Sequence, residues 1–279
     1  MSVDWGRTIH GIGDLHAGGI KRPRVAAMLD DVKKLPTPAL HLQSGDSTEN
    51  GLPKEDVLAL RWLGRLPGDA YTVLGNHDIM HNRRSAMAWA KEYGYESFNY
   101  VIDLPFLRII AVGPGRDQPK AKSGTLSETT LKWLELRLKR SEGRDCWIDC
   151  HWPLYKTVMG DSRKVYTSAM ESFHAKPDAR IRALLARNPN AKAWISGHTH
   201  SPLNAPHFIT RAKLPRDRTI ASINLSALVG VGKVRDPEDP ICSVYLTHLP
   251  GKVEVRFRDH RARAWKPVFR GKNVQTVRV

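Results

Sequence analysis

The sequence predicts a layered α/β fold. Short apolar runs typical of buried strands alternate along the chain with segments of helical periodicity, as in sheets whose strands are linked by helices. No internal repeat, low-complexity tract or flexible linker interrupts this alternation. With 279 residues, 41% of them hydrophobic, the chain can form one large domain or two small ones with a sizeable core.

Seven apolar runs and one hairpin are predicted as strands. The runs are short and rich in β-branched and aliphatic residues, which favours strands over helices. They cover residues 8–13, 39–44, 70–75, 106–113, 146–150, 193–196 and 219–225. The hairpin joins residues 242–249 to residues 252–259 through a turn at Pro250-Gly251.

Five segments are predicted as helices: 24–35, 54–66, 83–93, 127–140 and 178–188. The fourth has the clearest pattern, because Leu131, Leu134 and Leu138 recur at i, i+3 and i+7 and Ser127 can act as the N-cap. Residues 156–177 show no regular pattern. Both neighbours of this segment are strand-like, so it is predicted as a long loop near the functional site and not as a linker.

The chain is strongly basic, with 44 Lys and Arg against 28 Asp and Glu, a formal net charge of +16. We expect residues 1–250 to form the main domain and residues 251–279 to form a basic C-terminal strand and tail that packs on or extends from it. This charge favours anionic partners such as nucleotides, RNA or DNA. A solvated basic surface is an equally good interpretation of the tail.

The N-terminal stretch lacks the apolar core of a secretory signal, and no run approaches the ~18 apolar residues of a membrane span. Three cysteines, Cys146, Cys150 and Cys242, provide no disulfide framework. These features predict a cytoplasmic protein with no membrane partner.

Polar residues of the kinds that bind metals follow five of the predicted strands. In α/β sheets, sites form beyond the carboxyl ends of strands, so these side chains should converge. Each motif alone is weak, because a single histidine or Gly-Asp at a strand end is usually part of a turn. Five in one chain indicate a shared site. The segments are Asp14-Leu15-His16, Gly45-Asp46 with Glu49, Asn76-His77-Asp78, His151, and Gly197-His198-Thr199-His200.

The order of these motifs resembles the calcineurin-like metallophosphoesterase family. The matching stretches are GD-x-H, GD, GNHD, a single His and GHTH, spread over residues 13–200. Residues 124–138 are also similar to the helix that precedes the family's single metal-ligand histidine. The resemblance implies a four-layer αββα sandwich with two divalent metal ions over the strand ends.

The resemblance also implies a ligand set in which Asp46 bridges the ions. Two cations about 3.5–4 Å apart repel, so a shared carboxylate is needed. A set without thiolates suits Mn²⁺ or Fe first, with Zn²⁺, Co²⁺ or Ni²⁺ as alternatives. The first ion would be held by Asp14, His16, Asp46 and His200, and the second by Asp46, Asn76, His151 and His198.

His77 is similar to the family's catalytic histidine, which binds no metal and protonates or stabilises the leaving oxygen. Such a histidine needs an acidic group to orient it. The family supplies an Asp three residues after the bridging Asp, whereas this chain has the longer Glu49. We therefore expect Glu49 to orient His77, and Asp78 to support the loop.

Four further residues are candidates for substrate contacts: His81, Arg83, Arg84 and His174. The first three follow the GNHD motif, where a phosphate would arrive. The alternative for the two arginines is the solvated first turn of a helix.

The resemblance implies hydrolysis of a phosphoester by a metal-bound hydroxide. The chain lacks the GD-x-x-DRG and GNHE patterns of protein phosphatases and the tyrosine ligand of purple acid phosphatases. The remaining pattern is similar to bacterial and phage phosphodiesterases, so we expect a phosphodiester substrate. A cyclic nucleotide, with 2′,3′-cyclic favoured, fits the basic composition. A phosphomonoesterase, a nuclease acting on nucleic acid ends and a non-catalytic scaffold are the alternatives.

Overall fold

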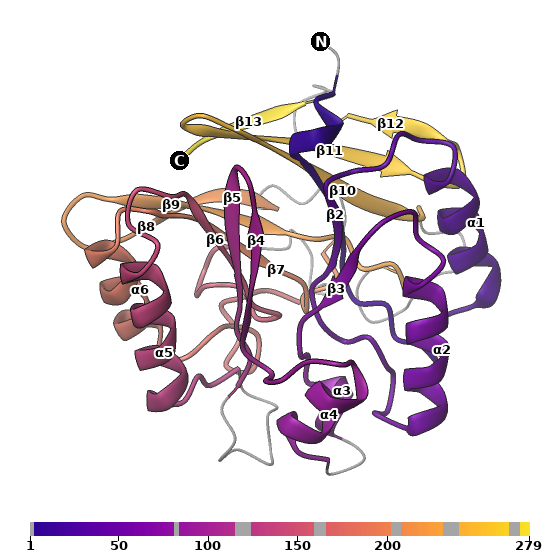
Figure 1. Cartoon of the computed structure of the whole chain (residues 1–279), viewed down its shortest axis with the longest axis horizontal. Coiled ribbons are helices and arrows are strands. Elements are labelled where there is room, and N and C mark those ends of the chain that lie inside the picture. The colour runs from indigo at the N-terminus through magenta and orange to yellow at the C-terminus, as the bar shows by residue number, and fades with distance from the viewer. Residues whose placement is uncertain are drawn as a thin grey trace.

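Two β-sheets lie face to face in this computed structural model, and helices cover the outer face of each sheet (Figure 1). The structure describes residues 3–80, 84–114, 124–158, 166–201, 208–230, 240–267 and 274–279. The layering is helices, sheet, sheet, helices. The predicted four-layer αββα sandwich is therefore confirmed.

The first sheet combines strands from both ends of the chain. Its order is β12-β11-β10-β1-β2-β3, and β13 also pairs with β11. The neighbours β1, β2 and β3 are parallel, while β10 pairs antiparallel with β1. The bounds are β1 Thr8–Ile12, β2 Leu40–Gln43, β3 Ala70–Thr72, β10 Cys242–Leu249, β11 Lys252–Asp259, β12 Ala264–Lys266 and β13 Gln275–Arg278.

The second sheet has the order β4-β5-β6-β7-β9-β8. Its four central strands, β5, β6, β7 and β9, are parallel, and the edge strands β4 and β8 are antiparallel to their neighbours. The bounds are β4 Tyr100–Leu104, β5 Leu107–Ala111, β6 Cys146–Asp149, β7 Ala191–Ser196, β8 Ile209–Lys213 and β9 Thr219–Asn224.

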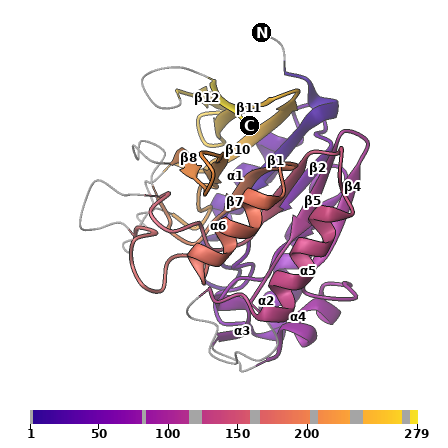
Figure 2. The same ribbon diagram turned by 90° about the vertical axis from the view of Figure 1, so that its left-hand side faces the viewer.

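Two helices cover each sheet. Helices α1 (Arg22–Val32) and α2 (Pro53–Leu63) lie over the first sheet, and α5 (Glu128–Lys139) and α6 (Asp178–Arg187) lie over the second, as Figures 1 and 2 show. The short helices α3 (His77–Met80) and α4 (Ala86–Glu92) follow β3, and a 3₁₀ turn, η1 (Trp5–Arg7), precedes β1. Ser127 caps α5 as predicted, because its hydroxyl accepts a hydrogen bond from the amide of Thr130 at 3.1 Å.

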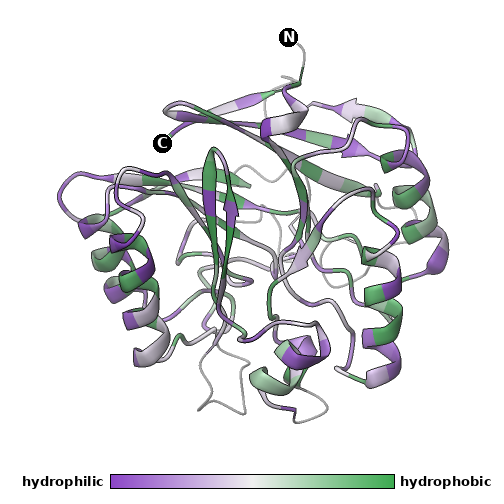
Figure 3. Ribbon diagram, viewed as in Figure 1, coloured by the Kyte–Doolittle hydropathy of each residue, from purple (hydrophilic) through white to green (hydrophobic). Residues whose placement is uncertain are grey.

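Apolar side chains fill the three interfaces between the four layers. Ile9 and Trp147 are fully buried between the two sheets. Leu29 packs between the first sheet and its helices, and Leu134 between the second sheet and its helices. Figure 3 shows the corresponding hydrophobic residues along the inner sides of the helices and along the strands. Burial of this apolar surface is the main stabilising term of the fold.

The sequence prediction missed four strands: β4, β8, β12 and β13. Strands β4 and β8 lie at the edges of the second sheet, and β12 and β13 pair only with the outer side of β11. Edge strands are short and carry polar residues, which protects them from pairing with other chains and weakens their sequence signal. The predicted hairpin 242–249 and 252–259, in contrast, has the bounds of β10 and β11.

The basic C-terminal segment is part of the first sheet. Strand β11 pairs with β10 over its whole length, from Lys252 to Asp259. Several of its cations are already neutralised: Arg258 pairs with Asp31, and Arg256 pairs with Glu254. The charge of this segment is therefore smaller in effect than the sequence count of basic residues indicates.

The three cysteines are buried and free, as the prediction of no disulfide framework requires. None of the helices in the described ranges combines the length and the apolar character that a bilayer span needs.

Candidate metal centre

The predicted ligands meet at the carboxyl ends of parallel strands. They follow β1, β2 and β3 of the first sheet and β6 and β7 of the second. All seven are buried, with at most 8% of any residue exposed. Six of them lie in groups of neighbouring ligand atoms: Asp14, His16, Asp46, His151, His198 and His200. Asn76 is buried and directly precedes His77, whose amide donates to Asp46.

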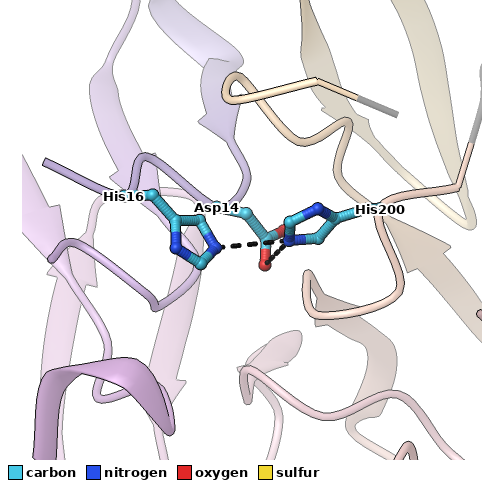
Figure 4. A group of neighbouring side chains, drawn as sticks. All are labelled: Asp14, His16 and His200. Carbon is cyan, nitrogen blue, oxygen red and sulfur yellow. Dashed lines mark hydrogen bonds and ion pairs between the residues drawn. The ribbon is translucent and has the colours of Figure 1, made fainter. Parts of the chain in front are cut away.

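One group of side chains consists of Asp14, His16 and His200 (Figure 4). The Nε2 atoms of His16 and His200 lie 3.3 Å apart, and Nε2 of His200 lies 3.3 Å from Oδ1 of Asp14. Asp46 lies beside this group, with Oδ2 3.6 Å from Nε2 of His16. These are the four residues predicted to hold the first ion.

A second group consists of Asp46, His151 and His198. Nε2 of His151 lies 3.2 Å from Oδ2 of Asp46 and 3.1 Å from Nδ1 of His198. The side-chain oxygen of Asn76 is buried and has no hydrogen-bond partner within the described structure. A buried amide oxygen without a donor is costly unless something else satisfies it, and a cation can do so.

The donor atoms of the second group are arranged to receive a cation. Nδ1 of His151 donates to the carbonyl of Ser44 at 2.7 Å, and Nε2 of His198 donates to the carbonyl of Ser172 at 3.0 Å. Each ring thus uses one proton outward, so when both rings are neutral the two nitrogens that face each other at 3.1 Å carry lone pairs. A divalent cation could then accept both lone pairs.

The charge states also suit a cation. Burial lowers the pKa of His16 to about 4 and of His198 to about 3, so both rings are neutral at pH 7. For Asp46, burial raises the pKa, but His151 and its other histidine neighbours outweigh burial and hold the pKa well below its usual range. Burial disfavours charge on His151, yet Asp46 and Asp14 raise its pKa to about 9. A cation bound here would therefore displace a proton from His151.

The backbone at the site is held in an unusual conformation. Five predicted ligands have left-handed φ angles: Asp14 30°, His16 49°, Asp46 53°, His198 70° and His200 47°. Such angles cost of order 1–3 kcal/mol for residues other than glycine and cluster at functional sites. Cross-links between the loops hold them, since the amide of His198 donates to both carboxylate oxygens of Asp14 at 3.0 Å and the amide of His16 donates to the Asp46 carbonyl at 2.8 Å.

Glycines let the loops approach closely. A Cβ on Gly75 would lie 2.1–2.2 Å from the amide nitrogen and a carboxylate oxygen of Asp46, and one on Gly45 would lie 2.5 Å from the His151 ring. Neither position can carry a side chain without moving a predicted ligand. Steric exclusion of any side chain therefore explains why glycine occupies these positions of the GD and GNHD motifs.

His77 lies next to both groups at the start of α3. One of its ring nitrogens lies within 4.8 Å of ligand atoms of His16 and Asp46. Its Nδ1 donates to the main-chain carbonyl of Glu49 at 2.7 Å, and its amide donates to Asp46 at 2.9 Å. Burial opposes the charged form, but Asp46 and the Glu49 carbonyl raise the pKa of His77.

The Glu49 side chain differs from the expectation. We predicted that its carboxylate would orient His77, but the carboxylate lies 2.9 Å from Nδ1 of His16. The hydrogen bond that orients His77 comes from the Glu49 main chain instead. The Glu49 carboxylate therefore pairs with a different ring from the one predicted.

Asp78 supports the loop, as predicted. It accepts hydrogen bonds from the amide and hydroxyl of Thr48, both at 2.9 Å, and from the amide of Gly75 at 2.9 Å. It therefore ties the loop after β3 to the loop after β2.

The Arg84 side chain is held by neighbouring residues and is 12% exposed. Its guanidinium makes two hydrogen bonds to the buried carboxylate of Asp56 and one, at 2.6 Å, to the Asp78 carbonyl. These contacts hold α2 against the loop, and the substrate role of Arg84 stays a prediction. His81 and Arg83 lie outside the described residues.

The loop predicted at 156–177 reaches the site through residues that the sequence analysis did not select. The Phe173 ring stacks on His198 at 4.6 Å, and Tyr166 stacks on Phe173 at 4.4 Å. His174, which we did select, packs against Tyr155 at 4.8 Å and donates to the Met170 carbonyl at 2.9 Å. The aromatic residues of this loop could have indicated contacts with the site. Their partner His198 is distant in sequence, so the sequence alone did not pair them.

Comparisons with known proteins agree with this geometry. The family model described as calcineurin-like phosphoesterase matches residues 7–202. A probable cyclic nucleotide phosphodiesterase of Synechococcus is 27% identical over 183 residues, 66% of this chain and 66% of the relative. A probable glycerophosphodiester phosphodiesterase of Arcobacter nitrofigilis is 32% identical over 125 residues, 43% of this chain and 44% of the relative. The aligned regions thus leave a third or more of each relative's length unmatched.

Solved structures support the fold. A dimetal phosphatase from Danio rerio superposes with a TM-score of 0.65 at 14% identity, covering 99% of both chains. Phosphopantetheinyl hydrolase from Mycobacterium tuberculosis superposes with a TM-score of 0.53 at 16% identity, covering 81% of this chain and 91% of that one. The family model covers more than half of the sequence and includes all seven converging residues. The chain therefore belongs to the calcineurin-like phosphoesterase family.

Proposed function

We propose that this protein is a dinuclear metal-dependent phosphodiesterase. The observation that carries the proposal is the position of Asp46, whose carboxylate groups with His151 and His198 and also lies 3.6 Å from Nε2 of His16 in the neighbouring group. One carboxylate between two cation sites is what a pair of mutually repelling ions requires. In this proposal Asp14, His16, Asp46 and His200 hold one ion, and Asp46, Asn76, His151 and His198 hold the other.

The metals that we propose are Mn²⁺ or Fe, with Zn²⁺, Co²⁺ or Ni²⁺ as alternatives. The donor atoms are imidazole nitrogens, carboxylate oxygens and one amide oxygen, and no described cysteine is among them. Such mixed nitrogen and oxygen sets suit these ions, and they do not select among them strongly. Two bound ions would neutralise the phosphate charge and lower the pKa of a water molecule that attacks phosphorus.

The chain's own residues would complete the chemistry. We propose that His77 protonates the leaving oxygen from Nε2, because its Nδ1 proton is used by the Glu49 carbonyl. The raised pKa of His77 supports this role, since a general acid works best with a pKa near the working pH. The short helix α3 and the Asp78 contacts hold the ring in position.

The proposed substrate is a phosphodiester, most favourably a cyclic nucleotide, and 2′,3′-cyclic over 3′,5′-cyclic. Two observations support it. The names of both relatives refer to phosphodiesterases. In addition, the stacked rings of Tyr166 and Phe173 adjoin His198, and Tyr166 lies 6.4 Å from His200. A nucleobase stacks readily on such aromatic side chains.

A side-by-side assay tests the proposal. Metal-loaded protein is given bis-p-nitrophenyl phosphate, p-nitrophenyl phosphate, 2′,3′-cyclic AMP, 3′,5′-cyclic AMP and glycerophosphoethanolamine, with Asp46→Ala as the blank. We expect the diester to be hydrolysed faster than the monoester, and 2′,3′-cyclic AMP faster than the other natural diesters. If p-nitrophenyl phosphate is favoured by tenfold or more, a phosphomonoesterase replaces the phosphodiesterase.

A further inference from the structure

Glu49 contacts two different histidines of the site with two different parts of itself. Its carboxylate oxygen Oε2 lies 2.9 Å from Nδ1 of His16. Its main-chain carbonyl accepts the Nδ1 proton of His77 at 2.7 Å. The rings of His16 and His77 lie edge to face, 4.5 Å apart, so the two contacts address neighbouring groups with separate roles.

The backbone on both sides holds Glu49 in register with His16. The loops after β1 and β2 continue the parallel pairing beyond the strands, because the amides of His16 and Ala17 donate to the carbonyls of Asp46 and Ser47, both at 2.8 Å. The amide of Glu49 then donates back to the Ala17 carbonyl at 3.0 Å. Glu49 also packs on Gly19, where a Cβ would lie 2.3 Å from its carboxylate. The Glu49 side chain is therefore aimed at His16 by the loop backbone.

The carboxylate determines how His16 can act as a ligand. With the proton on Nδ1, 2.9 Å from the Glu49 carboxylate, the Nε2 lone pair faces Nε2 of His200 at 3.3 Å and Asp46 at 3.6 Å. A carboxylate on the outer nitrogen of a ligand histidine fixes its tautomer and makes the inner nitrogen a stronger donor. The corresponding partners of His151 and His198 are carbonyl oxygens, which carry no charge.

We infer that Glu49 is a positioning residue with two independent contacts. Its carboxylate orients His16 to bind the first metal ion, and its main-chain carbonyl orients His77 for proton transfer. This inference rests on the proposed metal-dependent function. It differs from a simple acid–histidine pair, because the side chain and the main chain of one residue serve different partners. Changing the side chain should therefore affect metal binding and leave the His77 contact in place.

Side-chain length gives a sharp test. Aspartate at position 49 keeps the main-chain contact but withdraws the carboxylate by one methylene, roughly 1.5 Å, so it no longer reaches His16. Glutamine keeps the reach and an acceptor oxygen but removes the charge. If the carboxylate instead acted on His77, aspartate would be tolerated and glutamine would be the more damaging change.

The experiment measures metal binding directly. Wild type, Glu49→Asp, Glu49→Gln and Glu49→Ala are titrated with Mn²⁺ by calorimetry, and the Co²⁺-loaded proteins are compared by their visible absorption. The exposed Glu92→Gln is the matched control, and thermal melting of each metal-free variant checks the fold. We expect Glu49→Asp and Glu49→Ala to lower the affinity for one of the two metal ions by roughly 10–100-fold and to change the Co²⁺ spectrum. Glu49→Gln should lie between them and wild type.

A second measurement isolates the main-chain contact. With metal at saturating concentration, the dependence of the rate on the leaving group's pKa should be the same in Glu49→Asp and in wild type. Wild-type metal affinity in all three variants overturns the inference, and so does a leaving-group dependence altered in Glu49→Asp with metal binding intact. If wild type binds two ions but hydrolyses no phosphoester, the proposed function fails while the metal titrations still decide the role of Glu49.

Discussion

Two clusters of buried histidines in this protein differ in what their ring nitrogens face. One is the candidate metal centre. The other, which we call the histidine chain, runs from α1 across the first sheet. Its neighbouring side chains lie 2.7–2.9 Å apart, and the last ring also donates to the Pro67 carbonyl at 2.9 Å. The histidine chain consists of Asp31, His260, Ser243, His10 and His41.

Every ring nitrogen of the histidine chain has a hydrogen-bond partner. His10 and His41 lie directly opposite each other on β1 and β2, with ordinary extended backbone, and the chain ends at a carboxylate and a carbonyl. In the metal centre, by contrast, Nε2 of His16 faces Nε2 of His200, and the ligand backbone is left-handed. Buried polar groups are normally satisfied within the protein, so the metal centre indicates an additional partner and the histidine chain does not.

The position along the strand separates His10 and His41 from the histidines of the candidate metal centre, whereas His260 directly follows the end of β11. His10 and His41 lie inside strands, where their side chains point into a packed layer. The histidines of the metal centre lie beyond strand ends, where loops from both sheets meet. A histidine count in the sequence is thus less informative than the place of each histidine relative to its strand.

Removing the bridge should have the largest effect. We expect Asp46→Ala to lose bound metal and hydrolysis together, because the Asp46 carboxylate lies between His16 of the first group, at 3.6 Å, and His151 of the second, at 3.2 Å. Metal content by mass spectrometry and turnover of bis-p-nitrophenyl phosphate measure this. Asp46→Ala protein that retains two ions per chain and a near-normal rate contradicts the assignment.

His77→Ala should leave metal content unchanged and lower turnover by about 10²–10⁴, the range of a general acid. The loss should be smaller for substrates with good leaving groups, which need no protonation. Turnover of aryl diesters with a series of leaving-group pKa values measures this. Equal losses of turnover across the series would show that His77 is not the general acid.

Asp31→Asn should break the histidine chain without affecting the metal centre. Asp31 accepts two hydrogen bonds from Arg258, both at 2.8 Å; asparagine keeps one acceptor oxygen but leaves the buried positive charge unpaired, which costs about 3–5 kcal/mol of unfolding free energy. Urea unfolding measures the loss, and the metal affinity of the folded protein should stay at the wild-type value. Lost metal affinity with intact stability would show that the two clusters are coupled.

The Asp31 carboxylate should also make the stability of the protein depend on pH. Burial raises the pKa of Asp31, but Arg258 and His260 outweigh it and hold the pKa below its ordinary value. Its folded-state pKa is therefore depressed, so its contribution to stability is present above the unfolded pKa of about 4 and is lost as the pH falls below it. The stability difference between wild type and Asp31→Asn should shrink over this range.

Tyr166→Leu should have the smallest effect. Leucine keeps bulk against Phe173 but removes the outer aromatic face of the stack, so we expect KM for a nucleotide diester to rise about fivefold or more, from the loss of roughly 1 kcal/mol of stacking. KM for glycerophosphoethanolamine, which has no ring, should change less, and Tyr166→Phe is the control. An equal rise for both substrates would assign Tyr166 to packing against Phe173 alone.

The sequence by itself determined the types of the candidate ligands, their order and the strands they follow. Local patterns carry this information: apolar runs mark β1, β2 and β6, and Asp14, Asp46 and His151 follow within three residues of these strands. The hairpin of β10 and β11 could also be predicted from the sequence, because its two strands and its turn are contiguous.

Only the tertiary structure decided which partner each longer side chain reaches. The Glu49 carboxylate contacts His16, 33 positions before it, and Arg84 pairs with Asp56. The carbonyl of Ser172 accepts a hydrogen bond from His198. The edge strands β4 and β8 likewise exist because neighbours complete their hydrogen bonds. Such contacts join loops that are distant in sequence, and their distances depend on how the two sheets pack, which no local pattern encodes.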